Sequence, residues 1–183
     1  MLAELHTKRL LLRQWNKADY PIFAQLNSDP EVMQYYPNVL SEDESNALAH
    51  KIESLITAKG WGFWAVETCH DHKFIGFVGL HEPTYQLPVS PCIEIGWRLA
   101  KAYWGHGYAS EAACAALTFA FDVLKLPEVY SFASTSNLKS RAVMERLGLF
   151  NTHNNFNHPV IPAGNPLQEH ALYKIDKNTW DNL

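Results

Sequence analysis

Two glycines precede a long apolar helix in the segment Trp104–Ala109, which reads Trp-Gly-His-Gly-Tyr-Ala. Glycine allows the backbone to come close to a ligand. The first N–H groups of a helix have no internal partners, and the helix dipole adds about half a positive charge at this end. A glycine-bearing loop that opens a helix therefore predicts a binding site for a phosphate or pyrophosphate group.

The sequence on both sides of this loop predicts the elements that hold it. Ile93, Ile95, Trp97 and Leu99 are separated by single residues, and this period of two indicates a half-buried strand. From residue 109 to residue 124, apolar residues recur at helical spacing, which indicates one continuous helix face. A glycine turn that only opens a core helix is the alternative, but the preceding strand and a second motif downstream favour a ligand site.

The loop lacks the Gly-Lys-Ser or Gly-Lys-Thr of a nucleotide P-loop, and Ser110 stands where a dinucleotide fingerprint needs its third glycine. It resembles the coenzyme A loop of the GNAT superfamily of N-acetyltransferases, although Trp104 replaces the usual Gln or Arg. The longer run Tyr-Trp-Gly-x-Gly-Tyr-Ala-x-Glu-Ala is similar to the branch that contains the ribosomal-protein-alanine N-acetyltransferases. The resemblance implies that the pyrophosphate of acetyl-CoA binds at Trp104, Gly105, His106, Gly107, Tyr108 and Ala109.

A second motif, Asn-x-x-Ser-x-x-x-x-Glu-Arg-x-Gly, begins at Asn137 and resembles the family's segment beside the pantetheine arm. The resemblance implies that Asn137 hydrogen-bonds to that arm and that Ser140 lies near the thioester sulfur. Many members have a tyrosine general acid where this chain has Met144, which cannot donate a proton. Either Ser140 assists the leaving thiolate or no side chain does. The residues alone also allow a Ser140 hydroxyl bonded to the carbonyl four residues earlier.

Gly96 interrupts the strand that enters the loop, which indicates a bulge or a close backbone approach. In the family, this strand splays from its neighbour and the pantetheine arm lies in the gap. The resemblance implies that backbone groups of Trp97, Arg98 and Leu99 line the gap and that one strand N–H polarises the thioester carbonyl. A glycine that accommodates a bulky cross-strand neighbour is the alternative.

Acyl transfer requires a neutral amine. An α-amino group, with a pKa of ~8, needs little help at neutral pH, whereas a lysine, with a pKa of ~10.4, needs a general base. Glu94 is the first candidate for this base because it lies on the strand beside the proposed transfer site, and Glu82 on the preceding loop is the second. Each carboxylate has the alternative of a solvated or ion-paired role.

The loop-rich C-terminal segment contains His158 and His170, which could line an acceptor pocket or brace the loop by packing. Tyr35 and Tyr36 could border the same pocket. No histidine has metal-ligand spacing with a second ligand, so we expect no metal. The three cysteines lack Cys-x-x-Cys spacing and indicate reduced thiols in a cytoplasmic protein.

The 183 residues predict a single domain over 1–183, with 47% apolar and 19% charged residues. A formal net charge of −4 argues against general nucleic-acid binding. We see no signal peptide and no membrane span, and we expect a monomer or homodimer.

The resemblance covers nearly the whole chain and implies an α/β (α+β) fold with a GNAT-like mixed, largely antiparallel central sheet and helices on both faces. The sequence pattern predicts strands over 8–15, 62–67, 74–80, 93–99, 129–133, 150–156 and 167–175, and helices over 17–27, 41–59, 109–124 and 137–147.

The resulting hypothesis is an N-acetyltransferase that moves an acetyl group from acetyl-CoA directly to a primary amine. The amine belongs to a protein N-terminus or to a small molecule. The alternative is a non-catalytic coenzyme A-binding sensor or interaction module, which the missing tyrosine and the uncertain base leave open.

Overall fold

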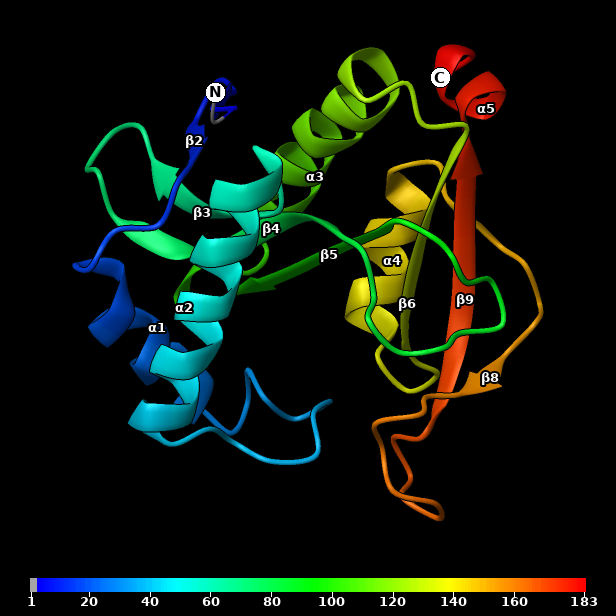
Figure 1. Ribbon diagram of the computed structural model, residues 1–183, viewed down its shortest axis with the longest axis horizontal. Coiled ribbons are helices and arrows are strands. Elements are labelled where there is room, and N and C mark those ends of the chain that lie inside the picture. The colour runs from blue at the N-terminus through cyan, green and yellow to red at the C-terminus, as the bar shows by residue number, and fades with distance from the viewer. Residues whose placement is uncertain (1–2) are drawn as a thin grey trace.

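The structure, a computed structural model, describes residues 3–183 (Figure 1). Its strands and helices largely follow the predicted order. The strands are β1 (Leu5–His6), β2 (Leu10–Arg13), β3 (Phe63–Thr68), β4 (Phe74–His81), β5 (Glu94–Leu99), β6 (Glu128–Ser134), β7 (Phe150–Asn151), β8 (Phe156–Asn157) and β9 (Glu169–Asp176). The helices are α1 (Asp19–Ser28), α2 (Glu42–Lys59), α3 (Tyr108–Thr118), α4 (Leu138–Arg146) and α5 (Lys177–Asp181), with short turns η1 (Lys101–Tyr103) and η2 (Phe119–Val123).

The strands form one mixed sheet in the order β1-β2-β3-β4-β5-β6-β9-β7, and β8 also pairs with β9. Every pairing is antiparallel except that between β5 and β6. The helices α1 and α2 lie on one face of the sheet, and α3 lies on the other (Figure 1). The expected sheet with helices on both faces is therefore confirmed.

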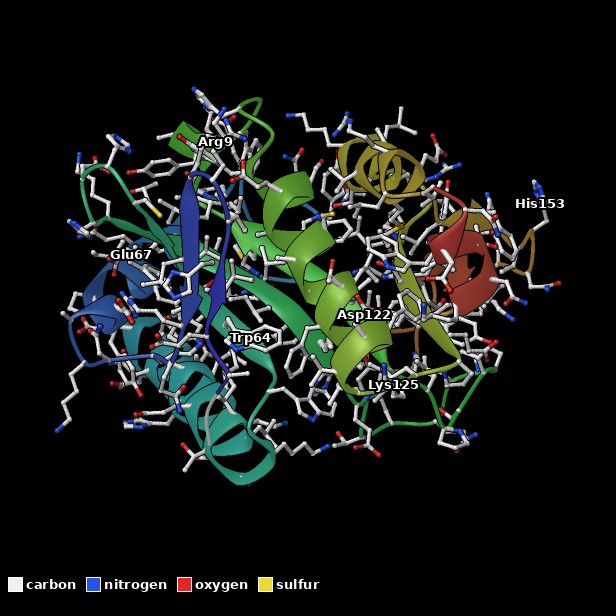
Figure 2. The ribbon with its side chains drawn as sticks, turned by 90° about the horizontal axis from the view of Figure 1, so that it is seen from above. Arg9, Trp64, Glu67, Asp122, Lys125 and His153 are labelled. Atoms are coloured by element: carbon white, nitrogen blue, oxygen red, sulfur yellow. The ribbon has the colours of Figure 1, made fainter. Side chains whose placement is uncertain are left out.

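Each face has its own apolar core. On one face, Trp64 packs edge-on against Phe119, beneath the helix that α3 and η2 form (Figure 2). On the other face, Phe23 of α1 and Ile56 of α2 pack on Phe74 and on other buried side chains of β3 and β4. The sheet is thus covered on both sides along β3 and β4. Strand β5 follows β4 in the sheet and leads to the junction with β6.

The capping signals of the second helix are correct. The Ser41 side chain accepts a hydrogen bond from the Glu44 N–H, and the Glu44 carboxylate accepts one from the Ser41 N–H, which completes a capping box. Gly60 ends the helix with φ +81°.

Replacing Ser41 by alanine is expected to lower the free energy of unfolding by about 1 kcal/mol, because the cap bond to the first turn is lost. Ser54→Ala is the matched control, since Ser54 is exposed inside the same helix, and alanine is the better helix former there. Urea unfolding of both variants measures the difference, and equal midpoints would contradict the capping role.

Three predicted elements differ from the structure, and one helix was not predicted. The first strand is split into β1 and β2 by a turn in which Thr7 N–H donates to the Leu10 carbonyl. The long helix is α-helical to Thr118 and continues as the wider turn η2. The predicted strand 150–156 is two short strands, β7 and β8, on either side of a loop in which His153 has φ +58°. The helix α5 was not predicted, and Asp176 caps it.

Candidate active site

The strands β5 and β6 separate soon after they meet. Their parallel register consists of one pair, Glu94 with Tyr130, and Tyr130 N–H donates to the Ile93 carbonyl at 2.9 Å. One residue further, the Ser131 hydroxyl rather than a backbone N–H donates to the Ile95 carbonyl, at 2.8 Å. Beyond this point, no β6 backbone group in residues 3–183 pairs with the β5 backbone. The two strands therefore splay apart, as the family resemblance implies.

The direction of the β5 backbone groups follows from the β4–β5 ladder. Ala100 N–H donates to the Ile75 carbonyl of the neighbouring chain segment, at 2.9 Å. Because groups alternate along an antiparallel strand, Arg98 also directs its backbone to β4, where it pairs with Phe77. Trp97 and Leu99 therefore direct their backbone groups into the gap. The expectation that the backbone groups of Trp97, Arg98 and Leu99 all line the gap is therefore wrong for Arg98.

Trp104, the departure from the family loop, ends this gap. Its indole N–H donates to the Leu99 carbonyl at 2.8 Å. The bond satisfies a carbonyl that the splayed strand leaves without a ladder partner. Trp104 thus fixes the glycine loop to the end of β5. Gly96 forms no bulge, because the β4–β5 register is continuous through it.

The glycine loop has the backbone geometry of an anion site. Gly105 and Gly107 have φ +77° and +79°, and both are exposed. The first intrahelical bond of α3 runs from Glu111 N–H to the Gly107 carbonyl, at 3.0 Å. The N–H groups of residues 108–110 therefore have no intrahelical acceptor and lie at the positive end of the helix dipole.

Basic side chains surround this helix end, and the sequence pattern did not predict them there. Arg9, in the turn just before β2, donates to the His106 carbonyl at 2.9 Å and pairs with Glu111. Arg146 of α4 donates to the Ser110 hydroxyl at 3.0 Å, and Lys139 lies 4.7 Å above the Trp104 ring. The Arg9–Glu111 pair braces the loop, whereas Arg146 and Lys139 form no ion pair within residues 3–183 and add positive charge.

A cavity of about 360 Å³ lies at the β5–β6 junction. It brings together most of the residues that were predicted at the transfer site: Glu94, Gly96, Trp97, Asn137, Ser140 and Met144, with Tyr35, Tyr36, His158 and His170 also in its lining.

Glu94 is the one carboxylate among the side chains that line this cavity. Burial raises the pKa of Glu94 to about 8, since the charged form loses hydration there. Glu82, the second candidate for the base, is exposed and pairs with Lys59, which holds the pKa of its carboxyl below the usual value. It lines a different, smaller cavity. The geometry therefore favours Glu94.

The α4 residues lie across the cavity from β5. The Asn137 side chain caps α4 by accepting the Ser140 N–H at 3.1 Å, which leaves its amide N–H groups free to bind a ligand. The Ser140 hydroxyl makes no bond to the carbonyl four residues earlier in this part of the chain, so the local alternative is not observed. Met144 is buried beside it and offers no proton.

Aromatic side chains form another part of the cavity lining. The His158 ring lies 4.8 Å from the His170 ring, and its Nε2 is 3.2 Å from the Tyr85 hydroxyl. Burial lowers the pKa of His158 to about 4 and also lowers the pKa of His170, so both rings are neutral at neutral pH. These histidines thus line the cavity and also pack against its wall.

Within residues 3–183 no cluster of three or more histidine, cysteine, aspartate or glutamate side chains could hold a metal ion. None of the helices in that range is both long enough and apolar enough to cross a bilayer.

Known proteins resemble this chain in sequence and in fold. The family described as "Acetyltransferase (GNAT) domain" matches residues 9–149. The chain is 30% identical over 176 residues to the uncharacterized N-acetyltransferase YnaD of Bacillus subtilis, covering 96% of this chain and 98% of YnaD. It is 31% identical over 183 residues to the FsC-acetyl coenzyme A-N(2)-transacetylase of Aspergillus fumigatus, covering 96% and 77%.

Solved structures show the same fold. A GNAT-family acetyltransferase from Bacillus anthracis superposes with a TM-score of 0.79 at 26% identity, covering 96% of this chain and 99% of that one. The spermidine N-acetyltransferase from Vibrio cholerae, solved with CoA and spermine, superposes with a TM-score of 0.74 at 22% identity, covering 96% and 100%. At that identity the second likeness concerns the fold alone.

Proposed function

Since the chain belongs to the GNAT family of acetyl-CoA-dependent N-acetyltransferases, we propose that it transfers the acetyl group directly to a primary amine held in the cavity at Glu94. One observation carries this proposal. The β5–β6 gap opens at one end beside Glu94 and Ser140 and leads at the other to the N-terminus of α3. This arrangement suits a long ligand with a reactive thioester at one end and phosphates at the other.

The proposed contacts involve groups that have no hydrogen-bond partner among residues 3–183. The N–H groups of residues 108–110, with the glycine loop Trp104–Ala109, bind the pyrophosphate. Trp97 offers its backbone carbonyl to the pantetheine arm, Leu99 offers its N–H because its carbonyl already accepts from Trp104, and the Asn137 amide adds one more contact. Arg98 is left out of the cofactor contacts because its backbone pairs with β4.

In the proposed reaction, the amine nitrogen attacks the thioester carbonyl carbon, forming the C–N bond while the C–S bond breaks. Glu94 accepts the proton that the amine loses. The Trp97 N–H stabilises the negative charge that develops on the carbonyl oxygen. The Ser140 hydroxyl can donate a hydrogen bond to the departing thiolate, a role that Met144 cannot take.

The acceptor is a small-molecule amine or a protein N-terminus. The motif similarity to ribosomal-protein enzymes has one further support, a 37% identity over 79 residues to the putative ribosomal N-acetyltransferase YdaF of Bacillus subtilis, which covers 43% of this chain. We propose a cytoplasmic location because Cys69 and Cys114 are free and exposed, as reduced thiols are in a reducing compartment. A monomer or homodimer without nucleic-acid partners completes the proposal.

Calorimetric titration with acetyl-CoA, followed by thiol release against a panel of amines, tests this function. We expect binding of acetyl-CoA and turnover with at least one amine. Binding without turnover of any amine would favour the sensor alternative, and absence of binding would contradict the assignment of the Trp104–Ala109 loop.

Arg146 should contribute electrostatically to this binding. Replacing it by alanine is expected to weaken coenzyme A binding about 3- to 10-fold at low salt, since one cation near the phosphates is worth roughly 1 kcal/mol. The difference should shrink as salt is added. The control is Lys17→Ala, which removes an exposed charge just before α1. A salt-independent loss for Arg146→Ala, or an equal loss for both variants, would contradict this role.

A further inference from the structure

A second cavity, of about 160 Å³, lies beside the first on the sheet face that α1 and α2 cover. Its floor is apolar and comes from α2, β3 and β4, whereas its charged lining is mainly basic. The apolar lining is Leu48, Ile52, Leu55, Trp61, Phe63, Phe77 and Leu80, and the polar lining is Lys51, Lys59, His81, Glu82 and Arg98.

Arg98 is the unusual member of this lining. Its Nη1 donates to the Asn27 side-chain oxygen at 2.7 Å, and its guanidinium lies 4.1 Å above the Tyr36 ring. Its Nε is buried and has no hydrogen-bond partner in the described chain. No aspartate or glutamate within residues 3–183 pairs with it. A half-buried guanidinium that makes one hydrogen bond to an uncharged side chain and has no counter-charge can bind a carboxylate.

The other ionisable groups leave this cavity positive. Lys59 is paired with Glu82, so their charges offset each other. Burial, with the nearby charges of Lys51 and Lys59, lowers the pKa of His81, so this histidine is neutral at neutral pH. Among the described residues, no carboxylate forms an ion pair with Lys51 or Arg98, so both remain as cations around an apolar floor.

The two cavities meet at Gly96. Glu94, Gly96 and Arg98 occupy alternate positions of β5 and therefore share one face of the sheet. A side chain at Gly96 would meet Phe63 of the smaller cavity at 3.3 Å and the Glu94 carboxylate of the larger one at 3.4 Å. The glycine thus leaves space between them. Arg98 spans the same boundary, since it lines the smaller cavity and stacks on Tyr36 of the larger.

We propose that the smaller cavity is an acceptor subsite for amines that also carry a carboxylate and an apolar side chain, which is the chemistry of apolar amino acids and short peptides. Arg98 binds the carboxylate, the apolar part lies between α2 and β3–β4, and the amine reaches Glu94. This inference rests on the proposed N-acetyltransferase function. Arg98 is then a specificity-determining residue.

The span of the site indicates which members of this class to compare. The Cα atoms of Glu94 and Arg98, four residues apart on one strand, are separated by about 13 Å. A free amino acid can bridge this distance only if the side chains of Glu94 and Arg98 both reach inward. A dipeptide has a longer separation between its amine and its carboxylate. A comparison of the rates with free amino acids and with dipeptides shows which of the two the site accepts.

Thiol release from acetyl-CoA tests the subsite with apolar amino acids, apolar dipeptides and the carboxamide of each. We expect kcat/KM to be at least tenfold higher for the carboxylates than for their carboxamides. In Arg98→Gln this preference should disappear, mainly through a higher KM, and Arg98→Lys should restore part of it. Lys101→Gln is the control, since it removes an exposed cation that pairs with Glu31 just beyond β5.

The outcomes separate this inference from the function on which it rests. Equal rates for carboxylates and carboxamides, or a preference that survives Arg98→Gln, would overturn the subsite. So would turnover confined to amines without a carboxylate, or no turnover of the panel by a protein that binds acetyl-CoA. Absence of acetyl-CoA binding to the unaltered protein would instead overturn the proposed function. Unchanged acetyl-CoA affinity in Arg98→Gln shows that the variant is folded.

Discussion

Replacing Gly107 by leucine is expected to weaken coenzyme A binding at least 100-fold while the protein stays folded. Gly107 is the N-cap of α3 with φ +79°, and a ligand at this helix end must approach the exposed loop closely. A leucine side chain would obstruct the N–H groups of residues 108–110. Loss of two charge-assisted hydrogen bonds, each worth about 1.5–3 kcal/mol, accounts for this reduction.

The same substitution should cost only modest stability. A β-carbon at Gly107 would lie 3.5 Å from Arg9, which is an ordinary contact. The left-handed backbone conformation costs a non-glycine residue roughly 1–2 kcal/mol.

Gly164→Leu is the matched control for this strain. Gly164 has φ +83° and is exposed, and no atom lies near a β-carbon built on it. Calorimetric titration with coenzyme A and urea unfolding of both variants separate binding from strain. An affinity in Gly107→Leu equal to that of the unaltered protein would remove the loop from the proposed site.

The local parts of this site could be predicted from the sequence because their signals are local. The period-two strand, the glycine loop and the helix periodicity all lie within residues 93–124, and the structure has the predicted elements there apart from the final turn. The cap residues Ser41 and Gly60 are correct for the same reason, since each needs only its own turn of chain.

Contacts between distant segments could not be predicted in this way. Arg9 binds the carbonyl of His106, beside the α3 N-terminus, across 97 positions of sequence, and no periodic pattern predicts such a contact. The role of the Arg98 side chain could not be predicted for another reason. In an alternating strand pattern it is one polar position among several, and only the packing of α1 and the Tyr36 segment on β5 isolates it from a counter-charge.

The C-terminal strands show how sequence pattern can also overstate regularity. The predicted strand 150–156 contains enough apolar residues for one edge strand, but Asn151 and Thr152 accept hydrogen bonds from the backbone N–H groups of the turn. Side-chain bonds of this kind compete with a strand ladder. The chain therefore pairs with β9 as two short strands, β7 and β8, and Thr152 N–H adds one bond to the Leu172 carbonyl just after β7.

Replacing Glu94 by glutamine is expected to lower kcat about 10²- to 10⁴-fold, the usual contribution of a general base, with coenzyme A affinity unchanged. The glutamine keeps the shape of the side chain and removes its ability to accept a proton. Because burial raises the pKa of Glu94 to about 8, kcat/KM should rise with pH up to this region in the unaltered protein. Glu94→Gln should keep only the pH dependence that the ionisation of the acceptor amine gives.

Stability provides an independent check on the same carboxyl. The pKa of Glu94 is higher in the folded state than its ordinary value of 4.5, so the folded protein binds more protons than the unfolded chain between pH 4.5 and about 8. The free energy of unfolding should therefore fall with rising pH in this window, and Glu94→Gln should lose this decline. Glu82→Gln is the matched control, since its carboxylate is exposed and paired with Lys59. Equal pH profiles of stability and equal rates for the unaltered protein, Glu94→Gln and Glu82→Gln would exclude Glu94 as the base. A slow Glu94→Gln variant whose stability also depends less on pH would instead place one buried, titrating carboxylate at the reacting amine.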